Sequence, residues 1–113
     1  MHELSLAMET IDLVTREAKR NGVSLIHEIL IEVGHLSGVE SDAFEFAMEL
    51  MVKGSILENA TIRLIRTPGT GKCTACNLEF MMSQRLDCCP VCNFVPSEII
   101  GGENFMVLSV VAE

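Results

Sequence analysis

Two pairs of cysteines constrain the fold of this chain more than any other feature of its sequence. Cys73 and Cys76 form the first C-x₂-C pair, Cys89 and Cys92 form the second, and twelve residues separate the pairs. Each C-x₂-C turn presents two sulfur atoms to one ion, so two turns together supply the four thiolates of a tetrahedral Zn²⁺ site. Because four thiolates leave no open position on the metal, we expect this zinc to be structural rather than catalytic.

The residues around the pairs are consistent with such a site. Asn77 and Asn93 each follow the second cysteine of a pair. Turns of this kind often need a residue in the left-handed conformation there, and Asn tolerates it best after Gly. Nothing in the sequence directs the fifth cysteine, Cys88, toward the metal. We interpret Cys88 as a partly exposed spare thiol, with exchange against Cys89 as the alternative.

Iron and disulfides are the alternatives to zinc for these cysteines. Rubredoxin-like iron carriers use similar turns, but with longer intervening loops and many aromatic residues, whereas this chain has five Phe, no Trp and no Tyr. The N-terminus lacks the pattern of a signal peptide, so we expect a cytoplasmic protein. In that compartment cysteines bind metal more often than they form disulfides. Zinc is therefore the favoured interpretation.

The segment RTPGTGKCTAC at residues 66–76 resembles a phosphate-binding loop only in part. A Walker A loop needs Gly at the position of Arg66 and Ser or Thr at the position of Cys73, where the hydroxyl group holds Mg²⁺. Both ends of the motif are missing. We therefore interpret PGTGK as a flexible turn that leads the chain into the metal site.

Periodicity predicts two helices and three strands outside the cysteine region. Apolar residues recur at helical spacing through the first 20 residues, and in SLIHEILIEV Leu25 shares an apolar face with Ile29 and Ile31. His27 lies in that strand and is interpreted as a core histidine, whereas His35 is expected in an exposed loop. The predicted elements are a helix over 4–20, a strand over 24–33, a helix capped by Ser41 and ended by Gly54, a strand over 60–67 and a strand over 104–113.

These elements predict an α+β fold, in which a small domain with two helices and a three-stranded sheet carries an inserted Cys₄ lobe similar to a zinc ribbon. We expect the domain to comprise residues 1–68 and 102–113, with the zinc-binding lobe at 69–101. The last two strands of the domain are predicted to pair with each other. The final strand, NFMVLSVVAE, is apolar on both faces and is predicted to be well covered.

The formal net charge of −8 over 113 residues argues against two classes of partner. Nucleic-acid binding needs clustered Lys and Arg, so it is not expected. No apolar run approaches the ~20 residues that span a bilayer, so no membrane partner is expected either. No combination of nucleophile, base and acid indicates an enzyme.

The first three residues, Met-His-Glu, can chelate a metal that prefers planar coordination. The α-amine of Met1, the backbone nitrogen of His2 and its imidazole Nδ1 form fused five- and six-membered rings that occupy three corners of a square plane. Ligation by a deprotonated amide suits Ni(II) and Cu(II) rather than tetrahedral zinc. We expect Met1 to be retained, because the histidine that follows it is bulky. A fourth ligand has to come from Glu3 or from elsewhere in the fold.

Four stretches of the chain together resemble the HypA/HybF family of nickel-insertion proteins. They are MHELSLAM at the start, GHLSGVES at 34–41, VKGSILENATIRL at 52–64 and the C-x₂-C-x₁₂-C-x₂-C lobe. The resemblance covers essentially the whole chain, and it implies a nickel metallochaperone that binds Ni(II) transiently and Zn(II) structurally. It also implies two partners, a nickel-handling GTPase and the large subunit of [NiFe]-hydrogenase, with urease as the client of some relatives.

The resemblance also implies roles for individual residues. By position in the family, His2 is the principal nickel ligand, Met1 and Glu3 lie at the same centre, and Glu40 in the LSGVE segment lies near it. The four cysteines match the family's zinc ligands. Some relatives have histidines beside their C-x₂-C pairs, where this chain has Asn. We expect a monomer or a weak homodimer.

A zinc-bearing module for protein–protein interaction is the alternative function, and the Met-His-Glu terminus would then be incidental. Residues 73–98 contain one Arg, no Lys and three acidic residues. Such a module would therefore bind proteins rather than DNA.

Overall fold

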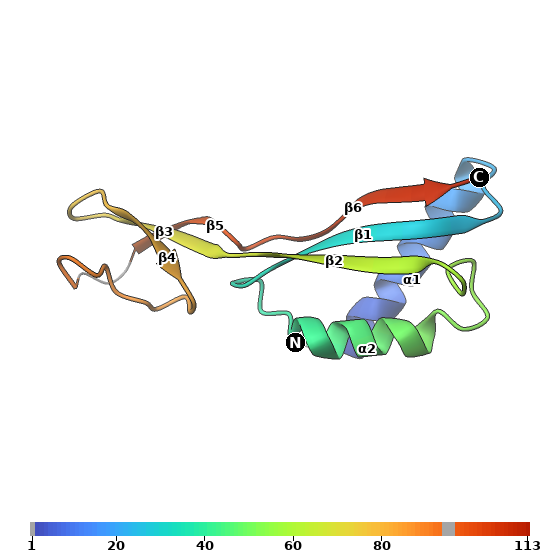
Figure 1. Cartoon of the computed structure of the whole chain (residues 1–113), viewed down its shortest axis with the longest axis horizontal. Helices are drawn as coiled ribbons and strands as arrows, with labels where there is room; N and C mark the ends of the chain where they lie inside the picture. The colour runs from blue at the N-terminus through green and yellow to red at the C-terminus, as the bar shows by residue number, and fades with distance from the viewer. Residues whose placement is uncertain (1, 94–96) are drawn as a thin grey trace.

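The computed structural model of the chain describes residues 2–93 and 97–113. Its elements lie along one long axis, with two helices and a three-stranded sheet at one end and a second three-stranded sheet at the other (Figure 1). The molecule measures 54 × 23 × 18 Å, and its radius of gyration of 17.3 Å exceeds the roughly 13 Å of a compact domain of this length. Within the described ranges, no helix combines the length and the apolar character needed to cross a bilayer.

Two helices and three strands form the larger body. Helix α1 spans Glu3–Arg20 and α2 spans Ser41–Met51, and the strands are β1 (Ile26–Gly34), β2 (Thr61–Thr67) and β6 (Phe105–Ala112). β1 is the central strand, parallel to β2 and antiparallel to β6. The predicted two helices and three strands are therefore present, each within a few residues of its expected position.

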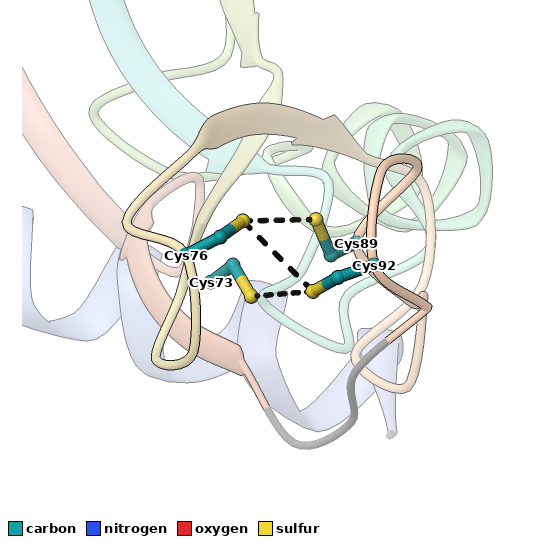
Figure 2. Close-up of side chains that lie close together, drawn as sticks. All are labelled: Cys73, Cys76, Cys89 and Cys92. Carbon is teal, nitrogen blue, oxygen red and sulfur yellow. Dashed lines mark hydrogen bonds between the residues drawn. The ribbon is translucent and has the colours of Figure 1, made fainter.

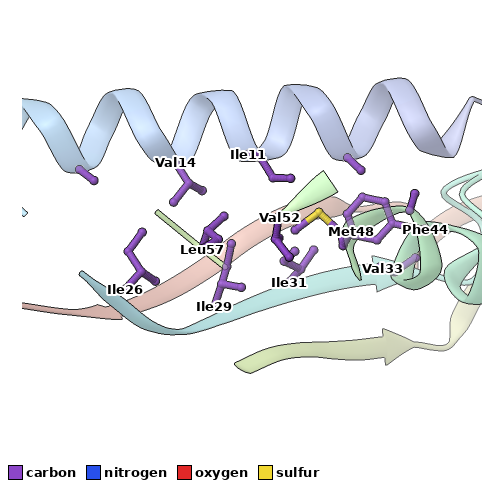
Figure 3. Packing of buried hydrophobic residues seen from close by; sticks show 13 residues of the cluster. Ile11, Val14, Ile26, Ile29, Ile31, Val33, Phe44, Met48, Val52 and Leu57 are labelled. Atoms are coloured by element: carbon purple, nitrogen blue, oxygen red, sulfur yellow. The ribbon is translucent and has the colours of Figure 1, made fainter. Parts of the chain in front are cut away.

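Both helices pack on one face of this sheet and bury a single core (Figure 3). Helix α1 turns its apolar stripe toward β1, as the helical spacing predicts, and Gly22 follows its end with a φ of +69°. Phe44 of α2 meets Phe105 of β6 edge to face, with ring centroids 5.0 Å apart. The buried apolar residues of this core are Ala7, Ile11, Val14, Ala18, Ile26, Ile29, Ile31, Val33, Phe44, Ala47, Met48, Val52 and Leu57.

A bulge in β1 changes which of its residues face the core. His27 is an extra residue in β1 relative to β6, so the alternation of faces is interrupted there. As a result Ile26 and Ile29 are both buried, whereas Leu25 is 41% exposed. The predictions that Leu25 lies on the apolar face and that His27 is a core histidine are both wrong. His27 is exposed, and its Nε2 contacts a carboxylate oxygen of Glu113.

Two predictions about the final strand are also wrong. β6 does not pair with β2, because β1, the strand with the most buried residues, lies between them. β6 is instead an edge strand, and Met106, Leu108 and Val111 on it are about half exposed. Leu13 and Val107 line an open apolar groove of about 530 Å³ between α1 and β6, so the helix layer does not cover this edge.

The cysteine region forms a second sheet of its own. β3 (Gly69–Cys73) lies between β4 (Glu79–Met82) and β5 (Ser97–Gly101) and is antiparallel to both. The prediction of a flexible turn at PGTGK is therefore wrong, because this segment contains the central strand of the lobe. The α+β class with a separate cysteine lobe is confirmed, while the proposed domain boundaries stay a prediction.

The glycines of β3 serve close packing rather than flexibility. A Cβ atom at Gly71 would lie 2.3 Å from the sulfur of Met82, and one at Gly69 would lie 2.7 Å from the side chain of Leu36. A strand interior tolerates glycine where another group approaches the backbone this closely. Leu36, from the loop between β1 and α2, is therefore buried against the second sheet.

Backbone contacts and one arginine join the two sheets. A Cβ atom at Gly34 would lie 2.1 Å from the carbonyl oxygen of Gly102, so the two backbones touch directly. The N–H of Leu36 donates to that same oxygen at 2.7 Å. Arg85 of the lobe donates through Nη2 to the carbonyl oxygen of Leu36 at 2.7 Å and through Nη1 to Glu103 at 2.9 Å.

Candidate metal centre

The four cysteines of the two pairs converge on one point in the lobe (Figure 2). Their sulfur atoms all lie within 4.8 Å of one another. The Sγ–Sγ distances are 3.3 Å for Cys73–Cys92, 3.7 Å for Cys76–Cys89 and 3.9 Å for Cys76–Cys92. Sulfur atoms around a tetrahedral zinc with Zn–S bonds of about 2.3 Å are about 3.8 Å apart, whereas a disulfide needs about 2.05 Å. The arrangement fits a four-coordinate metal and not a disulfide.

Matching turns hold the two pairs. The N–H of Asn77 donates to the carbonyl oxygen of Cys73, and the N–H of Asn93 donates to that of Cys89, both at 2.9 Å. Asn77 has a φ of 65° and Asn93 has a φ of 56°, and they are the only non-glycine residues with positive φ in the described ranges. The prediction of left-handed asparagines after each pair is confirmed.

Backbone N–H groups that point at sulfur favour thiolates in the cluster. The N–H of Cys76 is the main reason that the pKa of Cys73 is lowered to about 6, and the N–H of Cys92 similarly lowers the pKa of Cys89. The N–H of Leu78 lowers the pKa of Cys76, but burial and the sulfurs of Cys73 and Cys89 outweigh it and raise this pKa. A divalent cation between the four sulfurs would favour the deprotonated form of all of them.

Burial alternates between the members of the cluster. Cys73 and Cys89, the first residue of each pair, are buried, whereas Cys76 and Cys92 are exposed. Cys88 is exposed as well, and it does not join the group that the described residues form. The donor set is therefore two inner and two outer sulfur atoms.

The candidate nickel ligands of the larger body are brought together in part. His2 is exposed, and its carbonyl oxygen accepts the N–H of Leu6 at 3.0 Å as α1 begins. Glu3, the first residue of α1, accepts the backbone N–H of Glu40 on its Oε2 at 3.0 Å, although the two are 37 positions apart in the sequence. This hydrogen bond is the main cause of the lowered pKa of Glu3. Met1 lies outside the described residues.

Glu40 owes its position to the start of α2. It is the N-cap of that helix, so the prediction of Ser41 as the cap is wrong by one residue. The Oε1 atom of Glu40 accepts the N–H of Asp42 at 3.0 Å, as an N-cap side chain does, and its carbonyl oxygen accepts the N–H of Phe44 at 2.9 Å. His35 is exposed in the preceding loop, as predicted. The first turn of α2 therefore decides where Glu40 lies relative to the N-terminus.

Comparison with known proteins identifies the family. A family model described as "Hydrogenase/urease nickel incorporation, metallochaperone, hypA" matches residues 1–112. The chain belongs to the HypA family. The hydrogenase maturation factor HypA of Parabacteroides distasonis is 40% identical to it over 111 residues, which cover 98% of this chain and 96% of that protein. The HypA protein of Geotalea daltonii is 36% identical over 107 residues, which cover 95% and 94%.

Solved HypA structures share the fold described above. The solution structure of the Ni metallochaperone HypA from Helicobacter pylori matches with a TM-score of 0.68 at 23% identity, covering 99% of this chain and 97% of that chain. A second solution structure of a HypA protein matches with the same TM-score at 22% identity. The predicted membership of the HypA/HybF family is confirmed, and the arrangement of two helices, two sheets and a cysteine lobe is that of HypA proteins.

Sequence reasoning missed three side chains whose hydrogen bonds order the segments around these candidate sites. The Oδ2 atom of Asp87 accepts three hydrogen bonds, from the N–H and the hydroxyl group of Ser83 and from the N–H of Gln84. These bonds lower the pKa of Asp87 and close the turn before the second cysteine pair. The local spacing of SQRLD is a signal that could have revealed this turn. Arg66 and Arg85 bind partners 18 or more residues away, so no local pattern identifies them.

Proposed function

We propose that this HypA-family chain is a nickel metallochaperone, which binds Ni(II) at its N-terminus and delivers it during maturation of [NiFe]-hydrogenase. The observation that carries the proposal is the match of residues 1–112 to a family of nickel-incorporation metallochaperones. The chain is then a binding and transfer protein rather than an enzyme, and nickel is its cargo.

His2 is the principal nickel ligand in this proposal. The α-amine of Met1, the backbone nitrogen of His2 and its Nδ1 supply three corners of a square plane, which suits Ni(II). The exposure of His2 supports a site that takes up and releases its ion. Glu3 and Glu40, joined by the 3.0 Å hydrogen bond, supply carboxylates close to the terminus that can complete the plane.

Zinc is the ion that best suits Cys73, Cys76, Cys89 and Cys92. When bound, it supplies a crosslink that orders the lobe, at an apparent binding free energy of roughly 10–16 kcal/mol. The lobe needs such a crosslink because Met82 is the only buried apolar side chain, apart from cysteines, in the part of 69–101 that the structure describes. The metal thus replaces the apolar core that this small sheet lacks.

The proposed partners are a nickel-handling GTPase and the large subunit of [NiFe]-hydrogenase, in the cytoplasm. The similar proteins of P. distasonis and G. daltonii carry the name hydrogenase maturation factor, which supports a hydrogenase client. The family description also includes urease, so both apo-enzymes are substrates for a nickel-transfer assay.

The experiment that tests the proposal measures Ni(II) binding by isothermal titration calorimetry on zinc-loaded protein. Three proteins are compared: the chain with its native terminus, His2→Ala, and the chain with its α-amine at Met1 blocked by acetylation. We expect both changes to abolish high-affinity Ni(II) binding, because each removes a member of the chelate ring, while zinc content and helical circular dichroism stay the same. Equal Ni(II) affinity in all three proteins would instead favour the zinc-bearing interaction module.

Acidification gives an independent test of amide ligation. A backbone nitrogen has to lose its proton to bind the metal, so protons compete with Ni(II). We expect Ni(II) affinity to fall steadily as the pH decreases below neutral. An affinity that does not change between pH 8 and pH 6 would contradict ligation by the amide of His2.

A further inference from the structure

We propose that Arg66, on strand β2, is a positioning residue for the nickel-binding N-terminus. The inference rests on the proposed function, and it concerns a side chain that lies outside the Met-His-Glu terminus and forms its hydrogen bonds with Ser41 and Asp42. Three connected sets of hydrogen bonds lead from Arg66 to Glu3, the residue that follows His2.

The first link joins the two helices where each begins. Glu3 accepts the backbone N–H of Glu40 at 3.0 Å, and Glu3 is the first residue of α1 while Glu40 caps α2. His2 is covalently bonded to Glu3. A displacement of the Glu40 backbone therefore removes a restraint on the segment that carries the nickel chelate.

The second link fixes Glu40 to the first turn of α2. Its side chain accepts the N–H of Asp42 at 3.0 Å, and its carbonyl oxygen accepts the N–H of Phe44 at 2.9 Å. Phe44 is fully buried, so this turn is anchored on its inner side by the core. Asp42 on its outer side is exposed, so the core does not restrain that side.

Arg66 supplies that restraint from the neighbouring strand. Its Nε donates to the hydroxyl oxygen of Ser41 at 2.7 Å, and its Nη2 donates to Oδ1 of Asp42 at 2.8 Å. Arg66 pairs with Val33 in the β1–β2 ladder, so its backbone is fixed in the sheet. Helix α2 lies beside β2, so the guanidinium group links the sheet to the start of this helix (Figure 1). A planar guanidinium can donate to two adjacent residues at once in a fixed geometry, which lysine cannot do.

The exposure of the Arg66–Asp42 ion pair decides whether Arg66 positions the turn or stabilises the fold. The side chain of Arg66 is 47% exposed and that of Asp42 is 85% exposed. Ion pairs this accessible to water contribute little to global stability. The two short bonds therefore do more for the orientation of the first turn of α2 than for the stability of the fold.

The test compares Arg66→Met with Arg63→Met in the full-length, zinc-loaded chain. Arg63 is a matched control because it lies on the same strand and forms its own exposed ion pair, at 3.4 Å, with Glu28 of β1 instead of a residue of α2. Supporting groups around a metal ligand typically change affinity by 10–100-fold, so we expect Arg66→Met to weaken Ni(II) binding about tenfold. Arg63→Met should bind Ni(II) like the wild type, and Arg66→Lys, which keeps the charge without the fork, should also be weakened.

A second readout requires no nickel. Amide hydrogen exchange at Glu40, measured by NMR on the nickel-free protein, should be about tenfold faster in Arg66→Met and unchanged in Arg63→Met. The thermal midpoint of either variant should shift by no more than about 5 °C. A larger drop in the midpoint of Arg66→Met, with loss of zinc, would show a purely structural role and overturn the proposal.

These outcomes separate this proposal from the proposed function. If His2→Ala abolishes Ni(II) binding but Arg66→Met binds Ni(II) like the wild type, Arg66 has no positioning role and the nickel function stands. If His2→Ala leaves Ni(II) binding intact, the nickel function fails. Unchanged exchange at Glu40 in Arg66→Met refutes the positioning role in either case.

Discussion

Replacing Gly34 with alanine tests whether the two sheets are joined by rigid backbone contact. Gly34 ends β1, and an added Cβ atom would lie 2.1 Å from the carbonyl oxygen and 2.4 Å from the carbonyl carbon of Gly102. Both atoms belong to the backbone, so no side chain can rotate away to make room. The Gly102 segment would have to move by at least about 1.3 Å to restore an ordinary contact distance of 3.4 Å, at a cost of roughly 1–3 kcal/mol for overpacking.

That movement also affects two hydrogen bonds at the junction. The N–H of Gly34 donates to the carbonyl oxygen of Asn104, and the N–H of Leu36 donates to that of Gly102, each at 2.7 Å. Loss of each bond costs about 1 kcal/mol. With the overpacking cost, we expect Gly34→Ala to destabilise the chain by about 3–5 kcal/mol. For a chain of this length, such a loss lowers the thermal midpoint by about 13–21 °C.

The assay is thermal unfolding of the zinc-loaded protein, followed by circular dichroism, with Gly101→Ala as the control. A Cβ atom at Gly101 would lie 3.5 Å from Thr70, an ordinary contact, and Gly101 does not have a positive φ. We expect that variant to be unchanged or stabilised by up to about 1 kcal/mol. If Gly34→Ala melts within about 4 °C of the wild type, the junction yields easily and the reasoning from backbone contact is refuted.

Three further predictions concern the two candidate sites. Cys89→Ser, which removes an inner sulfur, should lower zinc content below one ion per chain by metal analysis while the helical circular dichroism is kept, because both helices lie in the larger body; full zinc occupancy would contradict a four-thiolate site. Asn77→Ala should lower the thermal stability of the lobe by about 1 kcal/mol while Asn77→Gly is neutral, because Asn77 has a φ of 65°; equal effects of the two changes would argue against a left-handed requirement. The Glu40 N–H lowers the pKa of Glu3 below its ordinary value of 4.5, so the stabilisation from this pair should be complete above pH 4.5 and lost as the pH falls through the lowered pKa. An NMR titration of the Glu40 amide should therefore show a midpoint below 4.5, and a midpoint above 4.5 would contradict the bond.

The parts of the fold that local patterns encode could be predicted from the sequence. The helical spacing in α1 predicts its buried stripe, because a single helix carries the whole signal. The cysteine spacing predicts convergent sulfur atoms, and the Asn residues after each pair predict left-handed turns, because these geometries depend on a few adjacent residues.

The parts that depend on distant contacts could not be predicted in the same way. The sequence predicts a turn at Gly69 and Gly71, because it does not show the close approach of Leu36 and Met82 to these residues. Because of the bulge at His27, the residues before it point to the opposite face of the sheet from the one that regular alternation predicts. Nothing in the local pattern of apolar and polar residues marks that change. Whether a strand lies at the edge or in the centre of a sheet depends on the strand order, which the sequence does not show. The apolar pattern of β6 therefore predicts a covered strand, although β6 lies at an edge.

The uneven burial of the four sulfur atoms would make a metal ion bound between them accessible from one side only. Cys73 and Cys89 lie inside the lobe, whereas Cys76 and Cys92 lie at its surface. A chelator or an oxidant approaching from water would meet the two surface sulfurs first, while the two inner ones would still hold a bound ion. Loss of such an ion would therefore proceed from the outside inward, with the ion still tethered to both halves of the lobe through Cys73 and Cys89.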